Sequence, residues 1–502
     1  MPKPFSTSLY LVSILSSSLV SQAEVSLPNI FGDHMVFQRE QTNPVWGWAE
    51  AGEEVTVSIN GQSHSTTADE NGDWQVDLEA LPVGGPYTLT VEGENSLTIE
   101  DVLSGEVWLC SGQSNMVWPV SRSNHADVEI VSANFPEIRL ISIPNVGTQE
   151  PQENFKGEWA VCSPESVPNF SAVGYFFGRR IHNTLGVPVG LIDNAWGGSA
   201  AEAWVPREVL AESDTFTEYL DNWDQKIENF SEEAHAEKLA EFKAWKAAGS
   251  PEPRMRYPRD IRVGNARPGN LYNGVLNPVI GYGIRGAIWY QGESNAGRSA
   301  EYQELFPLMI STWRDSWDQG DFPFYWVQLA DFKEEQDSPA PGGWAYVREA
   351  QTMTLSLPNT GEAVIIDAGE GRDIHPRDKQ TVADRLVRHA LANEYGFDLQ
   401  AASPRYESME VSGNEVILTF SEVDEGLYAF ETKEVIGFAI AGEDGEYVYA
   451  DAEIVGKNQV KVFAEEVEVP VAVRYAWASN PVANLYDRNG LPVTPFRTDS
   501  GE

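Results

Sequence analysis

Residues 105–116 read Gly105-Glu-Val-Trp-Leu-Cys-Ser-Gly-Gln-Ser-Asn-Met116, a run of apolar residues that ends in a short polar turn. Such a run is typical of a strand that is buried on both faces, as in a parallel sheet. Ser114 follows the turn, where a serine can present its hydroxyl at the carboxyl edge of the sheet. The spacing differs from the G-x-S-x-G elbow of α/β-hydrolases. The stretch therefore predicts an open α/β sheet with a candidate nucleophile at its edge.

Further apolar runs support this prediction, and helical stretches separate them. The runs cover residues 187–192, 284–290, 324–329 and 363–367. Strands of this kind between helices indicate a parallel sheet that is covered on both faces. Residues 207–262 interrupt the pattern, and their charged, alanine-rich part is helical in period. We expect a helical insertion there, as a lid or a surface decoration.

The segments on both sides of this α/β region have the alternating sequence pattern of β-strands. Residues 24–103 contain short alternating runs between turn signals such as Asn60-Gly61, which predicts a small β-sandwich. The chain returns to alternating runs after residue 401. The expected organisation is an N-terminal β-sandwich domain over 24–103, an α/β domain over 104–401 and a C-terminal β region over 402–502.

The first 23 residues have the pattern of a signal peptide. Lys3 is followed by an apolar run of about 12 residues and by Ser21-Gln-Ala23, which places small residues where a signal peptidase cleaves. The run is too short to span a bilayer, which takes about 20 residues. We expect a secreted or periplasmic protein with no membrane insertion after cleavage. Cys110 and Cys162 could then form one disulfide or remain two buried thiols.

The net charge of the chain limits the classes of partner that it can bind. The chain has 34 basic and 76 acidic residues, a net charge of −42. Such a surface repels nucleic acid and anionic membranes, so no nucleic-acid partner is expected. The sequence has no Cys/His cluster and no H-E-x-x-H motif, so neither a metal nor another cofactor is expected. Nothing in the sequence indicates the oligomeric state.

Three more glycine- or histidine-containing loops follow predicted strands. Glycines in Asp193-Asn-Ala-Trp-Gly-Gly-Ser199 leave backbone N–H groups bare, as an oxyanion hole requires. In Trp289-Tyr-Gln-Gly-Glu-Ser-Asn295, Gln291 could donate to the same oxyanion, and Glu293 could be a base, an anchor or a loop charge. A serine nucleophile needs an adjacent base, usually histidine. Among seven histidines, His375 is favoured because it follows the last strand of the α/β region.

Together these blocks resemble the SGNH hydrolases, and more closely the sialate O-acetylesterase group of carbohydrate esterases. The resemblance covers most of the chain, from Leu27-Pro-Asn-Ile-Phe-Gly-Asp-His-Met-Val-Phe-Gln38 to Gly490-Leu-Pro-Val-Thr-Pro-Phe-Arg497. It includes Gly112-Gln-Ser-Asn115 and Ile374-His-Pro-Arg-Asp-Lys-Gln380. It implies an SGNH-type three-layer domain with a parallel sheet.

The resemblance also implies roles for individual residues. Ser114 is the nucleophile, and His375 is the base. The oxyanion donors are the N–H groups of Ser114 and Gly197, with Gly198 as the alternative glycine, and the amide of Gln291. Asn115 and Glu293 in the same blocks are expected to bind substrate.

The acid of the triad departs from the family pattern. The family commonly places it three residues before the histidine, where this chain has Arg372. Asp373 is the first candidate and Asp367 the second. A Ser–His dyad without an acid is the third possibility.

The expected function is that of a serine-dependent carbohydrate O-acetylesterase acting on an O-acetylated carbohydrate, with 9-O-acetylated sialic acid as the first candidate. Acetylated xylan or another polysaccharide is the alternative substrate. The acidic surface does not attract an anionic sugar, although Arg285, Arg298 and Arg348 could do so locally. A non-catalytic carbohydrate-binding protein would suit the 16 tryptophans but needs neither Ser114 nor His375. A metal-dependent deacetylase lacks its ligand cluster.

Overall fold

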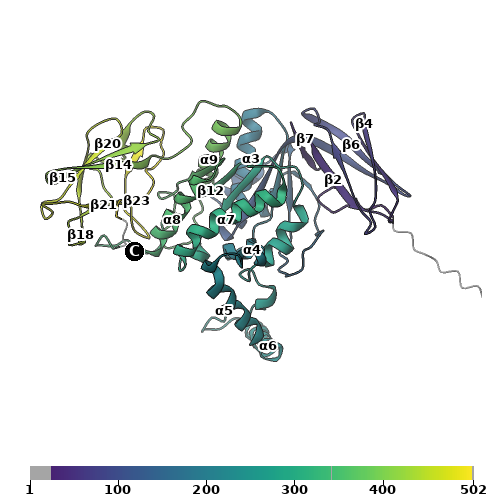
Figure 1. Cartoon of the computed structure of the whole chain (residues 1–502), viewed down its shortest axis with the longest axis horizontal. Helices are drawn as coiled ribbons and strands as arrows, with labels where there is room; N and C mark the ends of the chain where they lie inside the picture. Colours follow the sequence, from purple (N-terminus) through teal and green to yellow (C-terminus); the bar gives the residue numbers. More distant parts are fainter. Residues whose placement is uncertain (1–23, 341, 500–502) are drawn as a thin grey trace, which may run out of the picture.

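The computed structural model describes residues 24–340 and 342–499, and it contains three regions in a row (Figure 1). A β domain at the N-terminal end, a central α/β domain and a C-terminal β region lie along the long axis, and helices α5 and α6 project from the centre. The signal peptide that the sequence predicts over residues 1–23 lies outside the described residues. In the described part of the chain, no helix has the length and apolar character needed to cross a membrane.

The central sheet has the order β13-β12-β11-β7-β10-β8-β9, and all of its strands except β9 are parallel. The strands are β7 (Ser96–Gly112), β8 (Phe135–Ser142), β9 (Ala160–Cys162), β10 (Val189–Asp193), β11 (Gly286–Tyr290), β12 (Phe324–Val327) and β13 (Thr360–Ala363). Every residue of β11 and β12 is buried, as expected for strands that are covered on both faces.

Helices cover both faces of this sheet, so the domain has three layers. Alternate residues of β7 point to opposite faces. Val107 and Leu109 join a core with α7 (Ser299–Trp317) and α8 (Gly343–Met353), whereas Trp108 and Cys110 join a core with α3 (Ala172–Leu185) and α9 (Lys379–His389). The α/β prediction with a parallel three-layer domain is therefore confirmed. Cys110 and Cys162 are both buried and unpaired.

The N-terminal domain is continuous with the central sheet through β7. The first part of β7 pairs with β1 (Val36–Gln38) and β6 (Gly84–Glu92), and its last part pairs with β10 and β11. Strand β6 pairs in turn with β3 (Glu54–Ile59), which pairs with β4 (Gln62–Thr67), while β2 (Asn43–Trp48) pairs with β5 (Asp73–Leu78). The boundary expected between residues 103 and 104 thus falls inside one strand.

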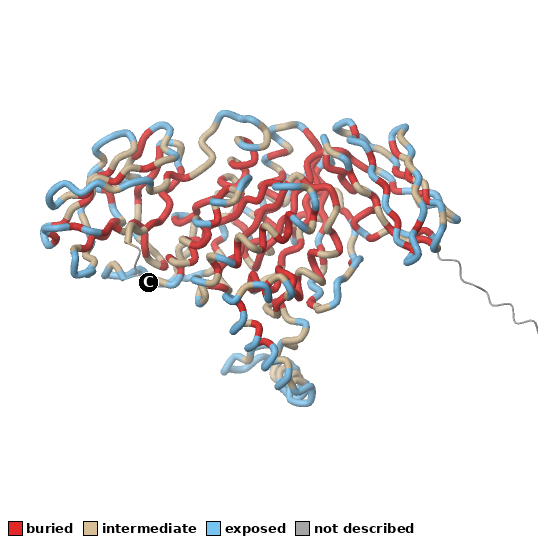
Figure 2. The backbone as a smooth tube through the Cα atoms, viewed as in Figure 1, coloured by how far each residue is buried: buried red, intermediate tan, exposed pale blue. Residues whose placement is uncertain are grey.

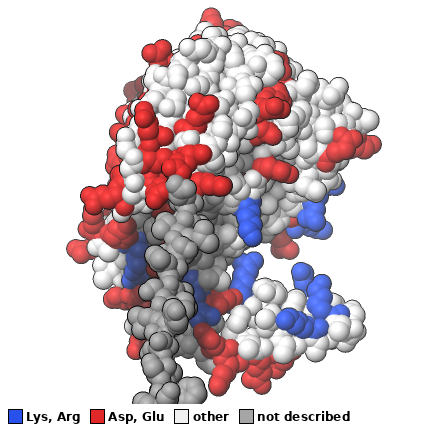
Figure 3. All heavy atoms as spheres, turned by 90° about the vertical axis from the view of Figure 1, so that its right-hand side faces the viewer, with Lys and Arg blue, Asp and Glu red and all other residues white. Residues whose placement is uncertain are grey.

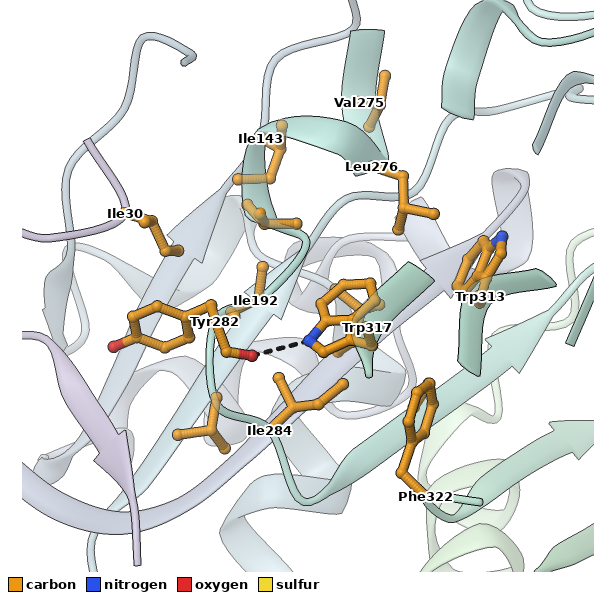
Figure 4. Close-up of a cluster of buried hydrophobic side chains, with 14 of the residues drawn as sticks. Ile30, Ile143, Ile192, Val275, Leu276, Tyr282, Ile284, Trp313, Trp317 and Phe322 are labelled. Atoms are coloured by element: carbon orange, nitrogen blue, oxygen red, sulfur yellow. Dashed lines mark hydrogen bonds between the residues drawn. The ribbon is translucent and has the colours of Figure 1, made fainter. Parts of the chain in front are cut away.

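A shared core joins these two domains (Figure 4). Ile30 of the N-terminal domain lies in one cluster with Tyr282, Ile284 and Trp317 of the α/β domain. The indole N–H of Trp317 donates to the Tyr282 carbonyl at 2.8 Å, and the Tyr282 hydroxyl donates to the Val36 carbonyl at 2.7 Å. The two domains are therefore packed as one unit.

The C-terminal region has its own core and is strand-rich. Its sheets have the orders β14-β15-β20-β19 and β18-β17-β21-β23, with a further pair of β16 and β22. The strands are β14 (Arg405–Ser412), β15 (Glu415–Ser421), β16 (Leu427–Ala429), β17 (Phe438–Ala441), β18 (Tyr447–Tyr449), β19 (Asp451–Ile454), β20 (Gln459–Phe463), β21 (Ala472–Tyr475), β22 (Leu485–Asp487) and β23 (Phe496–Arg497).

A buried arginine links this C-terminal region to the α/β domain. The Arg348 side chain on α8 is fully buried, and its guanidinium donates to the carbonyls of Leu329, Ala330, Ala478 and Ser479 at 2.7–2.9 Å. The first two carbonyls follow β12, and the last two belong to the C-terminal region. Burial lowers the Arg348 pKa to about 9. Arg348 therefore serves to hold two parts of the fold together.

The segment expected as a helical insertion contains α4 (Arg207–Leu210), α5 (Thr217–Glu228) and α6 (Glu232–Ala247). Helix α5 buries Leu220 and Trp223, whereas α6 buries no residue. Figure 2 shows the exposed residues of this projection clearly. The remaining short helices are α1 (Ser114–Val117) and α2 (Ala126–Val131).

Candidate active site

The loops that carry the predicted site residues meet at one edge of the central sheet. They follow β7, β10, β11 and β13 at their carboxyl ends. Strand register brings them together, because Asp193 pairs with Cys110 and Tyr290 pairs with Gly112. Carboxyl ends of parallel strands are where open α/β sheets build their ligand sites.

The turn after β7 places Ser114 at the start of α1. Gly112 has φ 135°, which favours glycine, and a Cβ there would collide with the Tyr290 carbonyl. The Gln113 backbone N–H donates to that same carbonyl at 2.9 Å. The Gln113 side-chain oxygen accepts from the Ser294 N–H at 3.3 Å. The neighbouring loop thus fixes the backbone that presents Ser114.

His375 lies directly against Ser114. Its Nε2 is 2.8 Å from the Ser114 Oγ, within hydrogen-bond reach of a base and its nucleophile. Trp118 stacks on the imidazole with ring centroids 5.2 Å apart and planes at 14°. Burial lowers the His375 pKa below 6.5. The charges of Lys379 and Arg122 lower this pKa further, whereas the charge of Asp373 raises it. The ring is therefore neutral at pH 7 and can accept the serine proton.

The carboxylate beside the base is Asp373. Its Oδ1 accepts from the His375 backbone N–H at 2.9 Å and lies 3.7 Å from Nδ1, too far for a hydrogen bond to the ring. Asp367 is engaged elsewhere, because Arg385 donates to it at 2.7 Å and Tyr486 at 2.9 Å. Of the two candidates, only Asp373 lies at the base. In this geometry it holds the loop and acts on the imidazole through its charge.

Gly197 lies against the nucleophile. A Cβ at Gly197 would be 3.6 Å from the Ser114 Cβ. Its carbonyl accepts from the buried Asn265 side chain at 2.6 Å, which fixes the peptide. Within residues 24–340 and 342–499, no hydrogen bond engages the N–H of Ser114 or Gly197. Gly198 has φ +73°, and a Cβ placed on it would instead be 3.4 Å from the Asn265 Nδ2.

Gln291 requires a correction. Its side chain is fully buried, and its Nε2 donates to the Ser199 carbonyl at 3.2 Å and to the Asn295 Oδ1 at 2.7 Å. Its Oε1 accepts from the Tyr302 hydroxyl at 2.9 Å. Both amide protons are therefore used, and Gln291 supports the glycine loop through Ser199 instead of donating to an oxyanion.

Asn115 also requires a correction, because it lies beneath the site, whereas Glu293 is half-buried and its role toward a substrate stays a prediction. Asn115 is 1% exposed, and its Nδ2 donates to the Glu293 Oε1 at 2.6 Å and to the Ile374 carbonyl at 3.0 Å. The residue after Ile374 is the base. Asn115 therefore connects the loop of the nucleophile to the loop of the base and cannot contact a substrate directly.

Lys379 completes this buried cluster, and the sequence prediction missed it. The side chain is fully buried, and its Nζ donates to the Asn115 Oδ1 at 2.6 Å. Burial lowers the Lys379 pKa to about 7 and raises the Glu293 pKa. Glu293 Oε2 is buried with no hydrogen-bond partner among the described residues. The signal was present, since Lys379 stands in the block that carries His375, four residues after it.

The arginines proposed for an anionic sugar have structural roles. Arg285 pairs with the buried Glu106 and Arg298 pairs with Glu202, while Arg348 binds backbone carbonyls. Two other arginines lie near the site. Arg122 stacks on Trp118 at 5.6 Å, and the Arg259 Nη1 is 3.9 Å from a Cβ placed on Gly198. Both are exposed, and neither has a carboxylate partner in the part of the chain that the structure describes.

Known proteins share this fold over most of its length. A carbohydrate acetylesterase from Xanthomonas citri is 35% identical, with a TM-score of 0.81, and the match covers 95% of this chain and 100% of that one. A rat sialate O-acetylesterase is 32% identical over 405 residues, 72% of each chain. The chain belongs to the sialate O-acetylesterase family. A human sialate O-acetylesterase is 28% identical over 92% of this esterase and 90% of its own length.

A family model described as "Carbohydrate esterase, sialic acid-specific acetylesterase" matches residues 265–393 of the esterase. This segment contains Gln291, Glu293, His375 and Lys379 but not Ser114. The chain is thus a carbohydrate esterase, a carboxylic ester hydrolase, as the sequence predicts.

Proposed function

We propose that Ser114 and His375 hydrolyse acetyl esters on sugar hydroxyls through an acetyl-enzyme. The observation that carries the proposal is the 2.8 Å contact between the His375 Nε2 and the Ser114 Oγ at the carboxyl edge of the sheet. The relatives support the acetyl ester as the bond cleaved, since those named above are acetylesterases.

The mechanism has two acyl-transfer steps. His375 takes the Ser114 proton as the Oγ attacks the acetyl carbonyl carbon, and the oxyanion accepts hydrogen bonds from the N–H groups of Ser114 and Gly197. The C–O bond to the sugar then breaks, and His375 gives its proton to the leaving sugar oxygen. Water, deprotonated by His375, attacks the acetyl-enzyme and releases acetate and Ser114. One oxyanion donor typically contributes about 100- to 1,000-fold in rate.

The acetylated sugar proposed first is a sialic acid, whose carboxylate needs a local positive charge. Arg259 supplies one next to Gly198 and Arg122 supplies another next to Trp118. In the view of Figure 3, groups of acidic side chains are spread over the large body, while basic ones lie on both sides of the recess between it and the smaller lobe. Cations at the site would offset the long-range repulsion of a net charge of −42.

The proposed setting is secretion or the periplasm after cleavage near residue 23. The pattern of Lys3, an apolar run and Ser21-Gln-Ala23 supports this proposal. N-terminal sequencing of the exported protein tests it, and a mature chain that begins near Glu24 is expected.

The activity is tested by acetate release from p-nitrophenyl acetate, 9-O-acetylated sialic acid and acetylated xylose, for the native enzyme and Ser114→Ala. We expect activity that falls at least about 1,000-fold in the variant. Arg259→Gln should raise KM for the acetylated sialic acid only. Survival of activity in Ser114→Ala would overturn the mechanism, and a preference for acetylated xylose would replace sialic acid with a neutral sugar.

A further inference from the structure

A cavity lies outside the catalytic pair, between residues 335–339 and the C-terminal β region. Its volume is about 410 Å³, within the range of roughly 300–1,000 Å³ that small-ligand pockets occupy. Neither Ser114 nor His375 lines it. The cavity is therefore a separate site that the proposed chemistry does not use.

The cavity adjoins the loop that carries the base. Residues 335–339 follow β12, so they leave the sheet at the same carboxyl edge as the catalytic loops. Asn480 lines the cavity, and its Nδ2 donates to the Lys333 carbonyl at 2.8 Å. The Lys333 N–H donates to the Gly371 carbonyl at 2.7 Å, two residues before Asp373. One wall of the cavity thus touches the loop of Asp373 and His375.

The lining combines apolar surface with hydrogen-bonding groups. Tyr449, Val482 and Ile436 are 53%, 57% and 40% exposed, which is unusual for large apolar side chains gathered around one cavity. Glu335 and Asp337 also line it, as does Arg474, whose charge is paired with that of Asp499. Carboxylates accept hydrogen bonds from sugar hydroxyls, and they repel anions, so this lining suits a neutral sugar.

Trp477 forms part of the cavity wall. The residue is 5% exposed, and its indole N–H is buried with no acceptor among the described residues. Aromatic side chains with one polar group are well suited to contacts that combine apolar and hydrogen-bonding character.

We infer that this cavity binds the neutral sugar units of the glycan whose acetylated unit lies at Ser114. The inference rests on the proposed function, because it places the remainder of that substrate. An acetylated oligosaccharide would then be held by two sites at one edge of the sheet, and a free acetylated monosaccharide by only one.

The test compares kcat/KM for O-acetylated sialyllactose with that for O-acetylated sialic acid, and acetylated xylotriose with acetylated xylose. Variants are Trp477→Phe, which removes the five-membered ring of the indole with its N–H and reduces the aromatic wall, and Tyr449→Ala, which removes another aromatic part of the wall. Phe430→Ala is the matched control, because Phe430 is 45% exposed in the same region and does not line the cavity.

The native enzyme should hydrolyse the esters of at least one pair. Within that pair, we expect a higher kcat/KM for the oligosaccharide than for the monosaccharide. The preference should fall about three- to tenfold in Trp477→Phe and in Tyr449→Ala, with unchanged rates on the monosaccharides and on p-nitrophenyl acetate. Equal kcat/KM values within both pairs, or a preference that both variants retain, would overturn the inference. A native enzyme inactive on all of these esters would instead overturn the proposed function.

Discussion

His375 lies between Ser114 and Asp373, and the surroundings of its ring set the pH at which it can act. Burial lowers its pKa below 6.5. The base must be neutral, so kcat/KM should rise as the pH increases through that lowered pKa and then stay level at neutral pH. A pH profile of acetate release measures this. An acid limb centred above 6.5 would contradict it.

Asp373→Asn should shift the acid limb of the pH profile to lower pH. Asp373 is the group whose charge raises the His375 pKa, so its removal lowers the pKa again. Loss of the 2.9 Å contact to the His375 N–H should also reduce the plateau rate. The matched control is Asp384→Asn, a surface partner of Arg180. A limb that stays in place or moves upward would show that Asp373 does not act on the imidazole through its charge.

Lys379→Met should reduce kcat more than it changes KM. Lys379 donates to Asn115, and Asn115 holds the Ile374 carbonyl next to the base. A displaced base costs up to about 100-fold in rate, so we expect a loss of roughly 10- to 100-fold. Kinetics on p-nitrophenyl acetate measure it, with the exposed Lys457→Met as control. Native kcat in Lys379→Met would show that this cluster does not position His375.

At the residue scale, motifs could predict which side chains meet but not how their hydrogen bonds are shared. Ser114 and His375 follow from polar loops at strand ends, and the structure places them 2.8 Å apart. Gln291 stands in such a loop as well, yet Ser199 and Asn295 from its surroundings accept both of its amide protons. A sequence pattern shows the donor but not the competing acceptors.

At the scale of elements, apolar runs could predict the parallel strands, whereas the length of β7 could not be predicted. Residues 96–101 of β7 are exposed or half-buried apart from Ile99, whereas residues 102–112 are all buried. The change of sequence pattern near residue 103, from alternating to continuous apolar residues, therefore marks where the strand becomes covered on both faces. It does not mark where the strand ends, and the expected domain boundary arose from that difference.

The loops after β12 and the C-terminal region depend on Arg348. Arg348→Met would leave the carbonyls of Leu329, Ala330 and Ala478 buried without a donor, whereas the Ser479 carbonyl keeps the N–H of Phe332. Each unsatisfied group costs about 1–3 kcal/mol, so we expect a free energy of unfolding lower by at least about 3 kcal/mol. Urea denaturation measures it against the exposed Arg488→Met. A loss equal to that control would contradict the role of Arg348 as the link.

At the scale of the whole molecule, the N-terminal domain and the α/β domain should unfold together because they share β7 and one core. Tyr282 is fully buried between them. Tyr282→Ala should lower the stability by about 3–5 kcal/mol, as loss of a buried aromatic ring usually does. Calorimetry should show one transition for both domains that moves to lower temperature. A separate N-terminal transition that does not move would contradict the shared unit.

The arrangement of charge and the positions of the sites around the edge of the sheet depend on how distant segments of the chain pack together. Composition gives the net charge of −42 but not the position of Arg259, which the insertion brings to Gly198. The cavity between residues 335–339 and the C-terminal region likewise depends on contacts between distant segments.

We propose that Ser114 is the nucleophile and that His375 activates it. Incubation of the native enzyme with a fluorophosphonate, followed by peptide mass spectrometry, tests it most directly because the reagent labels only an activated serine. We expect complete inactivation with one label on Ser114, and labelling slowed by at least about 100-fold in His375→Gln. A label on another residue, or acetate release that persists after Ser114 is fully labelled, would contradict it.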